Sequence, residues 1–126
     1  MLNLQLTEDV ELIDSIFNSL KKEKPDNVSF AVLFANKTPV GITAFYIADT
    51  IHIKGIGVLP EERGKGYGDF ISRVIVNMLS GYGNDIIVDY KSNYFYKFGF
   101  TDIEGDKMLV RVKDLKFPSK CKGDNV

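Results

Sequence analysis

The sequence predicts an α/β (α+β) fold in a single domain, with a mixed, mostly antiparallel sheet and helices on both of its faces. Three runs rich in β-branched and aromatic residues, 28–35, 40–48 and 50–58, follow one another with short connections, which indicates an antiparallel meander. A helical stretch then separates the third run from a buried strand at 85–90, and that crossover makes these two strands parallel neighbours. A length of 126 residues fits one domain.

The chain before the meander is expected to form a short strand and one helix. Residues 1–6 alternate apolar and polar side chains, as a strand does. Thr7 can cap the helix that follows, and acidic residues suit its first turn. The lysine-rich run 21–24 is typical of a solvated helix end, and Pro25 helps to stop the helix. Apolar residues at helical spacing predict one buried face: Val10, Ile13, Phe17 and Leu20.

The chain after residue 58 is expected to hold a long helix, a short aromatic helix and a hairpin. The aromatic helix covers 92–98 and ends at Gly99, and the hairpin joins 101–103 to 107–112. The polar tail 116–126 is expected to fray, and the motif-bearing core covers about 28–112. The long helix runs to about residue 79 and should lay one stripe on the sheet: Phe70, Ile71, Val74, Ile75, Met78 and Leu79.

Composition excludes several classes of protein. With 44% hydrophobic and 26% charged residues, the chain has the balance of a folded soluble protein, and no apolar run approaches the roughly 20 residues of a membrane span. Residues 1–6 lack the features of an export signal. A net charge of −1 gives no reason to expect nucleic-acid binding. The single cysteine, Cys121, agrees with a reducing cytoplasm, and one His with one Cys predicts no metal site.

The stretch that points to a ligand is Arg63-Gly64-Lys65-Gly66-Tyr67-Gly68, between the third strand and the long helix. Alternate glycines let backbone N–H groups approach a ligand closely, and the start of a helix favours anionic oxygens. Arg63 and Lys65 add two cations. The spacing fits neither the dinucleotide fingerprint nor the nucleoside-triphosphate loop. It predicts a phosphate or pyrophosphate site of another kind.

Two motifs carry a resemblance to a known family. Residues 63–68 match the pattern Q/R-x-x-G-x-G/A, which resembles the coenzyme A pyrophosphate loop of the GNAT family of N-acetyltransferases, and residues 57–62 look like its lead-in. The segment 92–100, Ser-Asn-Tyr-Phe-Tyr-Lys-Phe-Gly-Phe, is similar to the family's A-x-x-F-Y-x-x-x-G-F segment. The motifs stand in the family's order, with a helix and a strand between them. The resemblance covers about residues 28–112.

The resemblance implies acetyl-CoA as cosubstrate, held in a split between the strands at 50–58 and 85–90. Splayed strands leave backbone groups that the amides of the pantetheine arm can meet. Asp89 falls near a position where many relatives carry an Asn that contacts the pantetheine arm, so the chain departs from the family pattern at this contact. The residues expected to bind the cofactor are Ile56, Gly57, Val58, Arg63, Gly64, Lys65, Gly66, Tyr67, Gly68 and Asn93.

The reaction that the resemblance implies is direct attack of a primary amine on the thioester carbonyl, with a backbone N–H near Val58 holding the oxyanion. Cys121 lies far from both motifs, which disfavours a covalent route. Tyr96 resembles the family's general acid, and His52 aligns with the base of histone-type relatives. His52 can equally be a strand residue without a role, and Asp89 or water are competing bases.

Several alternatives stay open at the level of sequence. A non-catalytic CoA-binding or regulatory module would have the same fold, and an interaction domain whose glycine loop binds nothing is a third interpretation. The chain is short for the family, so one of the two usual N-terminal helices is expected to be missing and the acceptor side open. The acceptor can be a small amine, an amino acid, a peptide N-terminus or a lysine. The oligomeric state is also open, with a homodimer among the alternatives.

Overall fold

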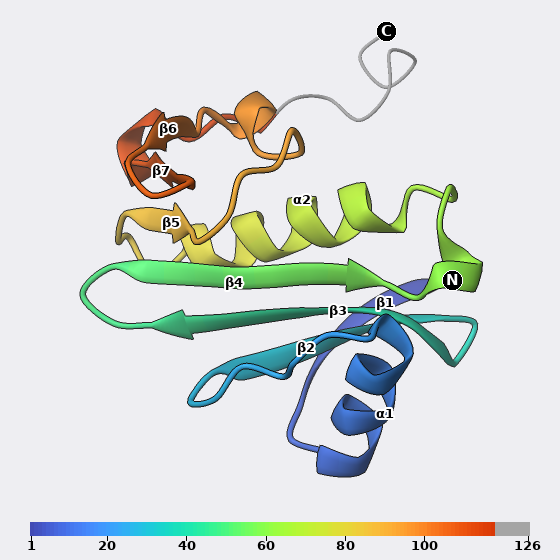
Figure 1. Ribbon diagram of the computed structural model, residues 1–126. Coiled ribbons are helices and arrows are strands. Elements are labelled where there is room, and N and C mark those ends of the chain that lie inside the picture. The colour runs from blue at the N-terminus through green and yellow to red at the C-terminus, as the bar shows by residue number, and fades with distance from the viewer. Residues whose placement is uncertain (118–126) are drawn as a thin grey trace, which may run out of the picture.

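The computed structural model describes residues 1–117. Two α-helices, α1 (Val10–Leu20) and α2 (Tyr67–Ser80), lie on opposite faces of one seven-stranded sheet (Figure 1). Three single-turn 3-10 helices follow the strands: η1 (Pro60–Glu62), η2 (Tyr96–Phe98) and η3 (Val112–Asp114). The strands are β1 (Leu2–Thr7), β2 (Ser29–Ala35), β3 (Thr38–Ile47), β4 (Ile51–Val58), β5 (Ile86–Val88), β6 (Thr101–Ile103) and β7 (Lys107–Val110).

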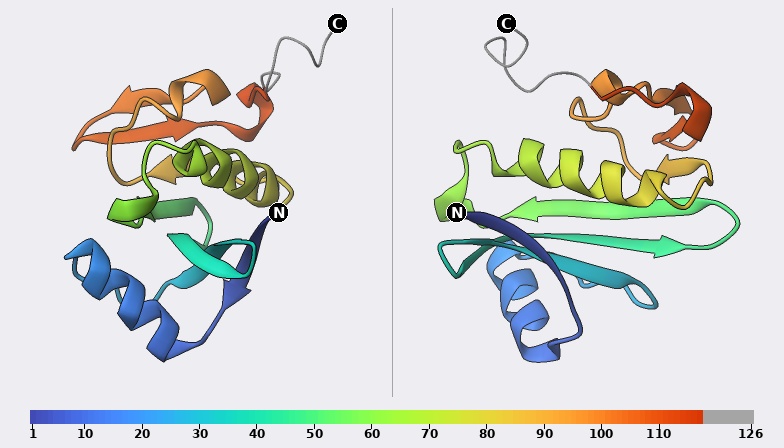
Figure 2. Two further views of the ribbon diagram at one scale, coloured as in Figure 1. Left: turned by 90° about the vertical axis from the view of Figure 1, so that its right-hand side faces the viewer. Right: turned by 180° about the vertical axis from the view of Figure 1, so that it is seen from behind.

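The sheet is mixed, in the order β1-β2-β3-β4-β5-β7-β6, and the views of Figure 2 show the two helices on its opposite faces. Strands β1 to β4 form the predicted antiparallel meander. Helix α2 crosses from β4 to β5, and these two strands pair in parallel, as expected. Strands β6 and β7 form the predicted closing hairpin. The predicted fold class is confirmed.

Helix α1 begins two residues later than the sequence suggested. Thr7 still belongs to β1, and its Oγ1 accepts a hydrogen bond from the Asp9 backbone N–H at 3.1 Å. Asp9 is the cap, because its Oδ1 accepts from the Leu12 N–H at 3.1 Å. The prediction for Val10 is also wrong: it is 59% exposed and borders a hollow between α1 and the strands, while Ile16 is buried.

The remaining members of the α1 face agree more closely with the prediction. Ile13 and Leu20 are buried, and Phe17 is half-buried with its ring edge-on to Phe30 on β2 at 5.8 Å. This face packs against Val32 and Ile42, which point to the α1 side of the sheet. Burial of this stripe fixes the C-terminal end of α1 over the middle of the sheet, where it later borders the candidate site.

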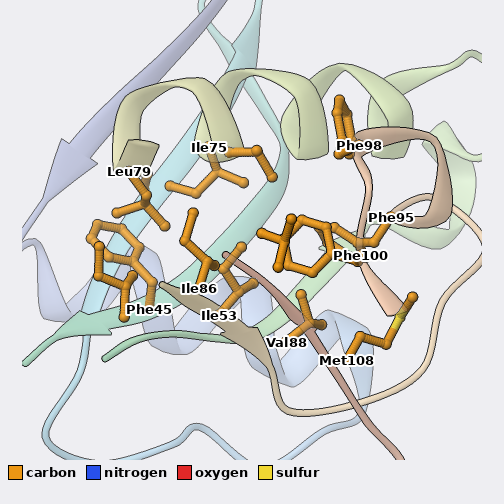
Figure 3. Close-up of a cluster of buried hydrophobic side chains, with 14 residues drawn as sticks. Phe45, Ile53, Ile75, Leu79, Ile86, Val88, Phe95, Phe98, Phe100 and Met108 are labelled. Carbon is orange, nitrogen blue, oxygen red and sulfur yellow. The ribbon is translucent and has the colours of Figure 1, made fainter. Parts of the chain in front are cut away.

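Helix α2 lies on the other face and covers the largest core cluster (Figure 3). Its buried residues recur at four-residue spacing, and Ile75 and Leu79 meet Ile53 and Ile86 of the parallel strand pair. The predicted stripe is rotated, because Phe70, Val74 and Met78 are only half-buried. The fully buried side chains of the helix are Ile71, Ser72, Ile75, Val76 and Leu79.

The aromatic segment folds differently from the predicted helix over 92–98. Only Tyr96–Phe98 forms a 3-10 turn, and Gly99 ends it with a φ of 98°. A helix of seven residues is costly to nucleate, and the segment instead turns tightly so that its phenylalanines reach the core. Figure 3 shows these rings beside α2 and β5, and all three are at most 2% exposed: Phe95, Phe98 and Phe100.

The predictions for the tail fall mostly outside the described residues, as does Cys121. Within residues 1–117, no helix combines the length and the apolar character that crossing a membrane would need.

The cap of α1 generates a first prediction. Asp9→Ala removes the side-chain acceptor for the Leu12 N–H and should lower the free energy of unfolding by about 1 kcal/mol. Chemical denaturation measures this loss. Glu8→Ala, at an exposed neighbouring carboxylate, is the matched control and should change stability by less than about 0.5 kcal/mol. Equal stability of the two variants would contradict the assignment of the cap.

Candidate functional site

The site begins where the parallel strands separate. Strand β5 pairs with β4 over three residues only, and the last ladder bond runs from the Asp89 N–H to the Ile53 carbonyl at 3.0 Å. Strand β4 continues through residues 54–58, whereas the segment that follows β5 turns away from it at Tyr90. Along this stretch the edge of β4 that faced β5 has no strand partner among the described residues. Its backbone groups can therefore pair with an extended ligand.

A β-bulge marks the same point on the other side of β4. Ala44 pairs with Gly55, and Phe45 pairs with Ile53, so Lys54 is an extra residue in β4. The buried Thr43 donates its hydroxyl hydrogen to the Gly55 carbonyl at 2.9 Å. The bulge and this bond lie where the pairing of β4 with β5 ends.

Two hollows lie over the exposed part of β4. They share four residues and so form one continuous groove: Leu20, Lys22, Ile56 and Gly57. The inner hollow, about 360 Å³, adds Phe17, Glu23, Pro25, Ile42, Ala44, Lys54, Gly55 and Tyr90. The loop hollow, about 350 Å³, adds Val58, Glu62, Arg63, Gly64, Gly66, Tyr67, Gly68 and Tyr94. Each volume is in the range of small-molecule sites.

The glycine loop ends the groove at the N-terminus of α2. Gly64 and Gly66 both have a φ of 84°, a conformation that other residues rarely adopt. Gly66 is the cap position of α2, and no side chain within residues 1–117 caps this helix end. The space beside both glycines is open to 4 Å. The first N–H groups of α2 can therefore meet an anionic ligand, and the phosphate site expected here stays a prediction.

The cationic side chains near the loop include Arg63 and Lys65, which the sequence indicated, and Lys22, which it did not. Arg63 donates from Nε to the Val58 carbonyl at 3.0 Å, and Lys65 pairs with Glu62 Oε1 at 2.9 Å. That hydrogen bond raises the pKa of Lys65. Lys22, at the end of α1, borders both hollows and has no ion pair within the described residues. Its position in the lysine-rich run gave no signal, because the fold alone brings α1 to the loop.

Tyr94 occupies a place in the groove that sequence reasoning missed. It borders the loop hollow, and its hydroxyl lies so close to Gly68 that a Cβ there would come within 2.6 Å. A side chain at position 68 would clash with the Tyr94 hydroxyl, so only glycine fits there unless Tyr94 moves. Asn93, predicted to bind the cofactor, is exposed and borders neither hollow.

Tyr96 lies apart from the groove. It is 46% exposed, borders neither hollow, and donates its hydroxyl hydrogen to Asp102 Oδ1 at 2.8 Å, which raises the pKa of the phenol. The family segment has three residues between its tyrosine and its glycine, but this chain has two between Tyr96 and Gly99. Counted back from Gly99, the position falls on the buried Phe95. The role of Tyr96 as proton donor stays a prediction.

His52 and Asp89, the two competing bases, form a pair at the end of the gap. His52 Nδ1 lies 3.1 Å from Asp89 Oδ1, and the imidazole stacks on Tyr46 at 4.6 Å. Lys54 Nζ reaches Asp89 Oδ2 at 2.7 Å, and this hydrogen bond raises the pKa of Lys54. Burial alone would raise the pKa of Asp89, but the hydrogen bonds from Lys54 and His52 outweigh it and lower that pKa. Of these residues only Lys54 borders the groove.

A groove of this form, with a glycine loop at a helix start and parallel strands that separate, can be compared with known proteins. The model of the acetyltransferase (GNAT) family matches residues 2–100. The chain belongs to the GNAT family. No curated protein sequence matches it.

Solved GNAT structures share the fold of this chain. Naa50 from Arabidopsis thaliana, with the bisubstrate analogue CoA-Ac-MVNAL, has 20% identity and a TM-score of 0.65 over 86% of this chain and 95% of its own. A GNAT enzyme from Brucella melitensis, in complex with acetyl-CoA, has 15% identity and a TM-score of 0.64 over 88% of each chain. The KacTA–DNA complex has 10% identity and a TM-score of 0.65 over 90% and 94%.

The charge cluster of this GNAT chain makes a prediction about pH. Because the pKa of Asp89 is lower in the folded protein, its stabilisation is complete above the ordinary value of 3.8 and is lost as the pH falls through the folded pKa. Asp89→Asn should lower the free energy of unfolding by about 1 kcal/mol at pH 7. The difference from the parent should shrink as the pH falls below 3.8 and should vanish once Asp89 is protonated in the folded protein.

Denaturant titrations over this pH range measure the effect. The matched control is Asp49→Asn, in the exposed β3–β4 turn, which should change the free energy of unfolding by less than about 0.5 kcal/mol. A constant deficit in Asp89→Asn at every pH would mean that the charge of Asp89 does not stabilise the fold.

Proposed function

We propose that the chain is an acetyl-CoA-dependent N-acetyltransferase, which moves an acetyl group to a primary amine by direct attack on the thioester. The observation that carries this proposal is the groove along the unpaired edge of β4. It leads from the uncapped N-terminus of α2 into the inner hollow. The acetyl-CoA bound by the Brucella neighbour and the CoA-peptide analogue bound by Naa50 support the same cosubstrate here.

The cofactor would lie along the groove with its pyrophosphate on the glycine loop. Backbone N–H groups at Gly66 and Tyr67, with Lys22 and Arg63 beside them, suit phosphate oxygens. The pantetheine arm would run in extended form beside residues 56–58 and pair with the free edge of β4 as an added strand. The acetyl end then reaches the inner hollow.

The chemistry asks for a neutral amine, a stabilised oxyanion and a protonated leaving thiol. The sequence placed the oxyanion at a backbone N–H near Val58, but Val58 borders only the loop hollow, so the backbone N–H of Ile56 or Gly57, which border both hollows, is proposed to hold it. Asp89 is the weakest candidate base, because its lowered pKa keeps it ionised and poorly basic. His52 or water remain as proton acceptors in this proposal, and His52 would act through water because it does not border the groove.

The acceptor would enter the inner hollow, whose charged residues carry both signs: Lys22, Glu23 and Lys54. This mixture suits a small amine or a peptide amine. The KacTA neighbour was solved with DNA, but a net charge of −1 gives this chain no comparable attraction to a polyanion. Nucleic acid is therefore not proposed as a partner.

One observation favours a second candidate, a non-catalytic CoA-binding module. The two residues that the sequence assigned to proton transfer, Tyr96 and His52, both lie outside the groove lining. Isothermal titration with acetyl-CoA and a thiol-release screen of amine acceptors separate the two functions. Binding without turnover on any amine would support the module, and absence of binding would overturn both.

The glycine loop offers a prediction with a matched control. Gly66 and Gly105 both have positive φ, 84° and 78°, and open space beside them, but only Gly66 borders the groove. Substitution by Val should strain both backbones equally, by about 1 kcal/mol or more. Gly66→Val should also weaken CoA binding at least tenfold, because its side chain would stand where phosphate oxygens sit.

Calorimetric titration of both folded variants tests this prediction. Gly105→Val should bind CoA as the parent does, despite its lower melting temperature. If Gly66→Val and Gly105→Val bind equally well, the pyrophosphate site lies elsewhere.

Lys22 gives a prediction about charge. Lys22→Ala should weaken CoA binding by about 1 kcal/mol, roughly fivefold, as loss of a charge-assisted phosphate contact does. The loss should shrink at high salt, since exposed charges are screened. Lys113→Ala, at an exposed lysine on η3, should leave the affinity unchanged. A loss in Lys22→Ala that is independent of salt would contradict an electrostatic role.

A further inference from the structure

Tyr90 is the first residue of the chain that leaves the ladder at the gap. It follows Asp89, whose N–H makes the last bond to β4. Its ring packs edge-on to the buried Phe95, with centroids 6.1 Å apart and planes at 84°. It borders the inner hollow together with Lys54 and Gly55. Tyr90 is therefore anchored in the core on one side and lies at the groove on the other.

The Tyr90 hydroxyl is buried and has no hydrogen-bond partner within the described residues. A buried donor without a partner destabilises a protein, so such a group needs an explanation. Burial, with a smaller contribution from the nearby Tyr94, raises the pKa of this phenol. It therefore stays protonated at neutral pH and can donate a hydrogen bond, but it cannot serve as a base.

A ligand in the inner hollow, which Tyr90 borders, would give this donor a partner. With the pyrophosphate on the glycine loop, the arm leads away from the loop hollow, past Ile56 and Gly57, to the inner hollow. The acylated end of the arm is then the part that lies by Tyr90. The other two tyrosines of this segment are placed differently, since Tyr94 borders the loop hollow and Tyr96 is bonded to Asp102.

We propose that the Tyr90 hydroxyl donates a hydrogen bond to the thioester carbonyl of bound acyl-CoA and so is a further catalytic residue. This rests on the proposed function. The bond would strengthen as negative charge develops on the carbonyl oxygen during attack by the amine, and no proton needs to be transferred. Free CoA lacks the carbonyl, so the contact distinguishes the acylated from the free cofactor.

The test is Tyr90→Phe, which keeps the ring and removes only the hydroxyl. Because the Tyr90 hydroxyl has no hydrogen-bond partner within the described residues, the melting temperature of Tyr90→Phe should equal that of the parent or exceed it. Affinity for acetyl-CoA should fall about fivefold, affinity for CoA should change less than about twofold, and kcat should fall about 10- to 100-fold. Tyr82→Phe, at a 57% exposed tyrosine in the α2–β5 turn, is the matched control.

A second measurement uses the parent protein. The chain has six tyrosines and no tryptophan, so a near-ultraviolet difference spectrum reports on tyrosine alone outside the adenine band. Acetyl-CoA should perturb this spectrum more than CoA does, and the excess should be missing in Tyr90→Phe.

Each remaining outcome overturns the inference. Tyr90→Phe with full affinity and turnover, or with a lower melting temperature and unchanged kcat, gives the hydroxyl no role toward the ligand. Equal losses for CoA and acetyl-CoA place the contact on the arm instead of the thioester. A loss of turnover confined to Tyr96→Phe assigns the donor to Tyr96. A parent that does not bind acetyl-CoA fails the proposed function itself, whereas binding and turnover unaffected by Tyr90→Phe fail only this inference.

Discussion

The early end of the β4–β5 pairing is the constraint on which the rest of the structure depends. Backbone N–H and C=O groups inside a protein need partners, and β5 supplies them to β4 over three residues only. The bulge at Lys54 and the hydrogen bond from the Thr43 hydroxyl to the Gly55 carbonyl lie at the same point of β4. What remains of β4 is an edge that a strand-like ligand can complete, and it leads straight to the N-terminus of α2.

Side chains from distant segments shape this edge into a groove. Leu20 at the end of α1 lies over Gly57 so closely that a Cβ there would come within 2.7 Å. Tyr94 does the same over Gly68, which leaves glycine the only fit at either position without movement of the neighbour. At the closed end of the gap, Asp89 binds Lys54 and His52 and ties β4 to the start of the groove. The groove is thus built from α1, β4 and the segment after β5.

The aromatic segment 92–100 is one residue shorter than the family pattern, and this explains why Tyr96 lies outside the groove while Tyr90 and Tyr94 border it. Three phenylalanines of this segment are buried against α2, and a single 3-10 turn is enough to seat them. The geometry of this turn also sets the directions of the neighbouring tyrosines. Tyr96 donates a hydrogen bond to Asp102, and Tyr94 contacts Gly68 of the glycine loop. Tyr90, which precedes the turn, borders the inner hollow, and its hydroxyl is buried. A motif tyrosine can therefore keep its place in the sequence and still lie away from the groove.

The sequence by itself determined the element order, the parallel strand pair and the glycine loop. Those features follow from local periodicity, from alternate glycines in one short stretch and from the crossover rule, all of which can be applied along the chain without knowledge of the tertiary packing. Local pattern could not decide that Asp9 rather than Thr7 caps α1, or that Val10 is exposed, because these depend on where the helix meets the sheet. The placement of Lys22, Tyr90 and Tyr94 in the groove was decided only by the tertiary structure. All three residues are far from the glycine loop in sequence. The packing of α1 on the sheet and of the Phe95 ring in the core sets their positions.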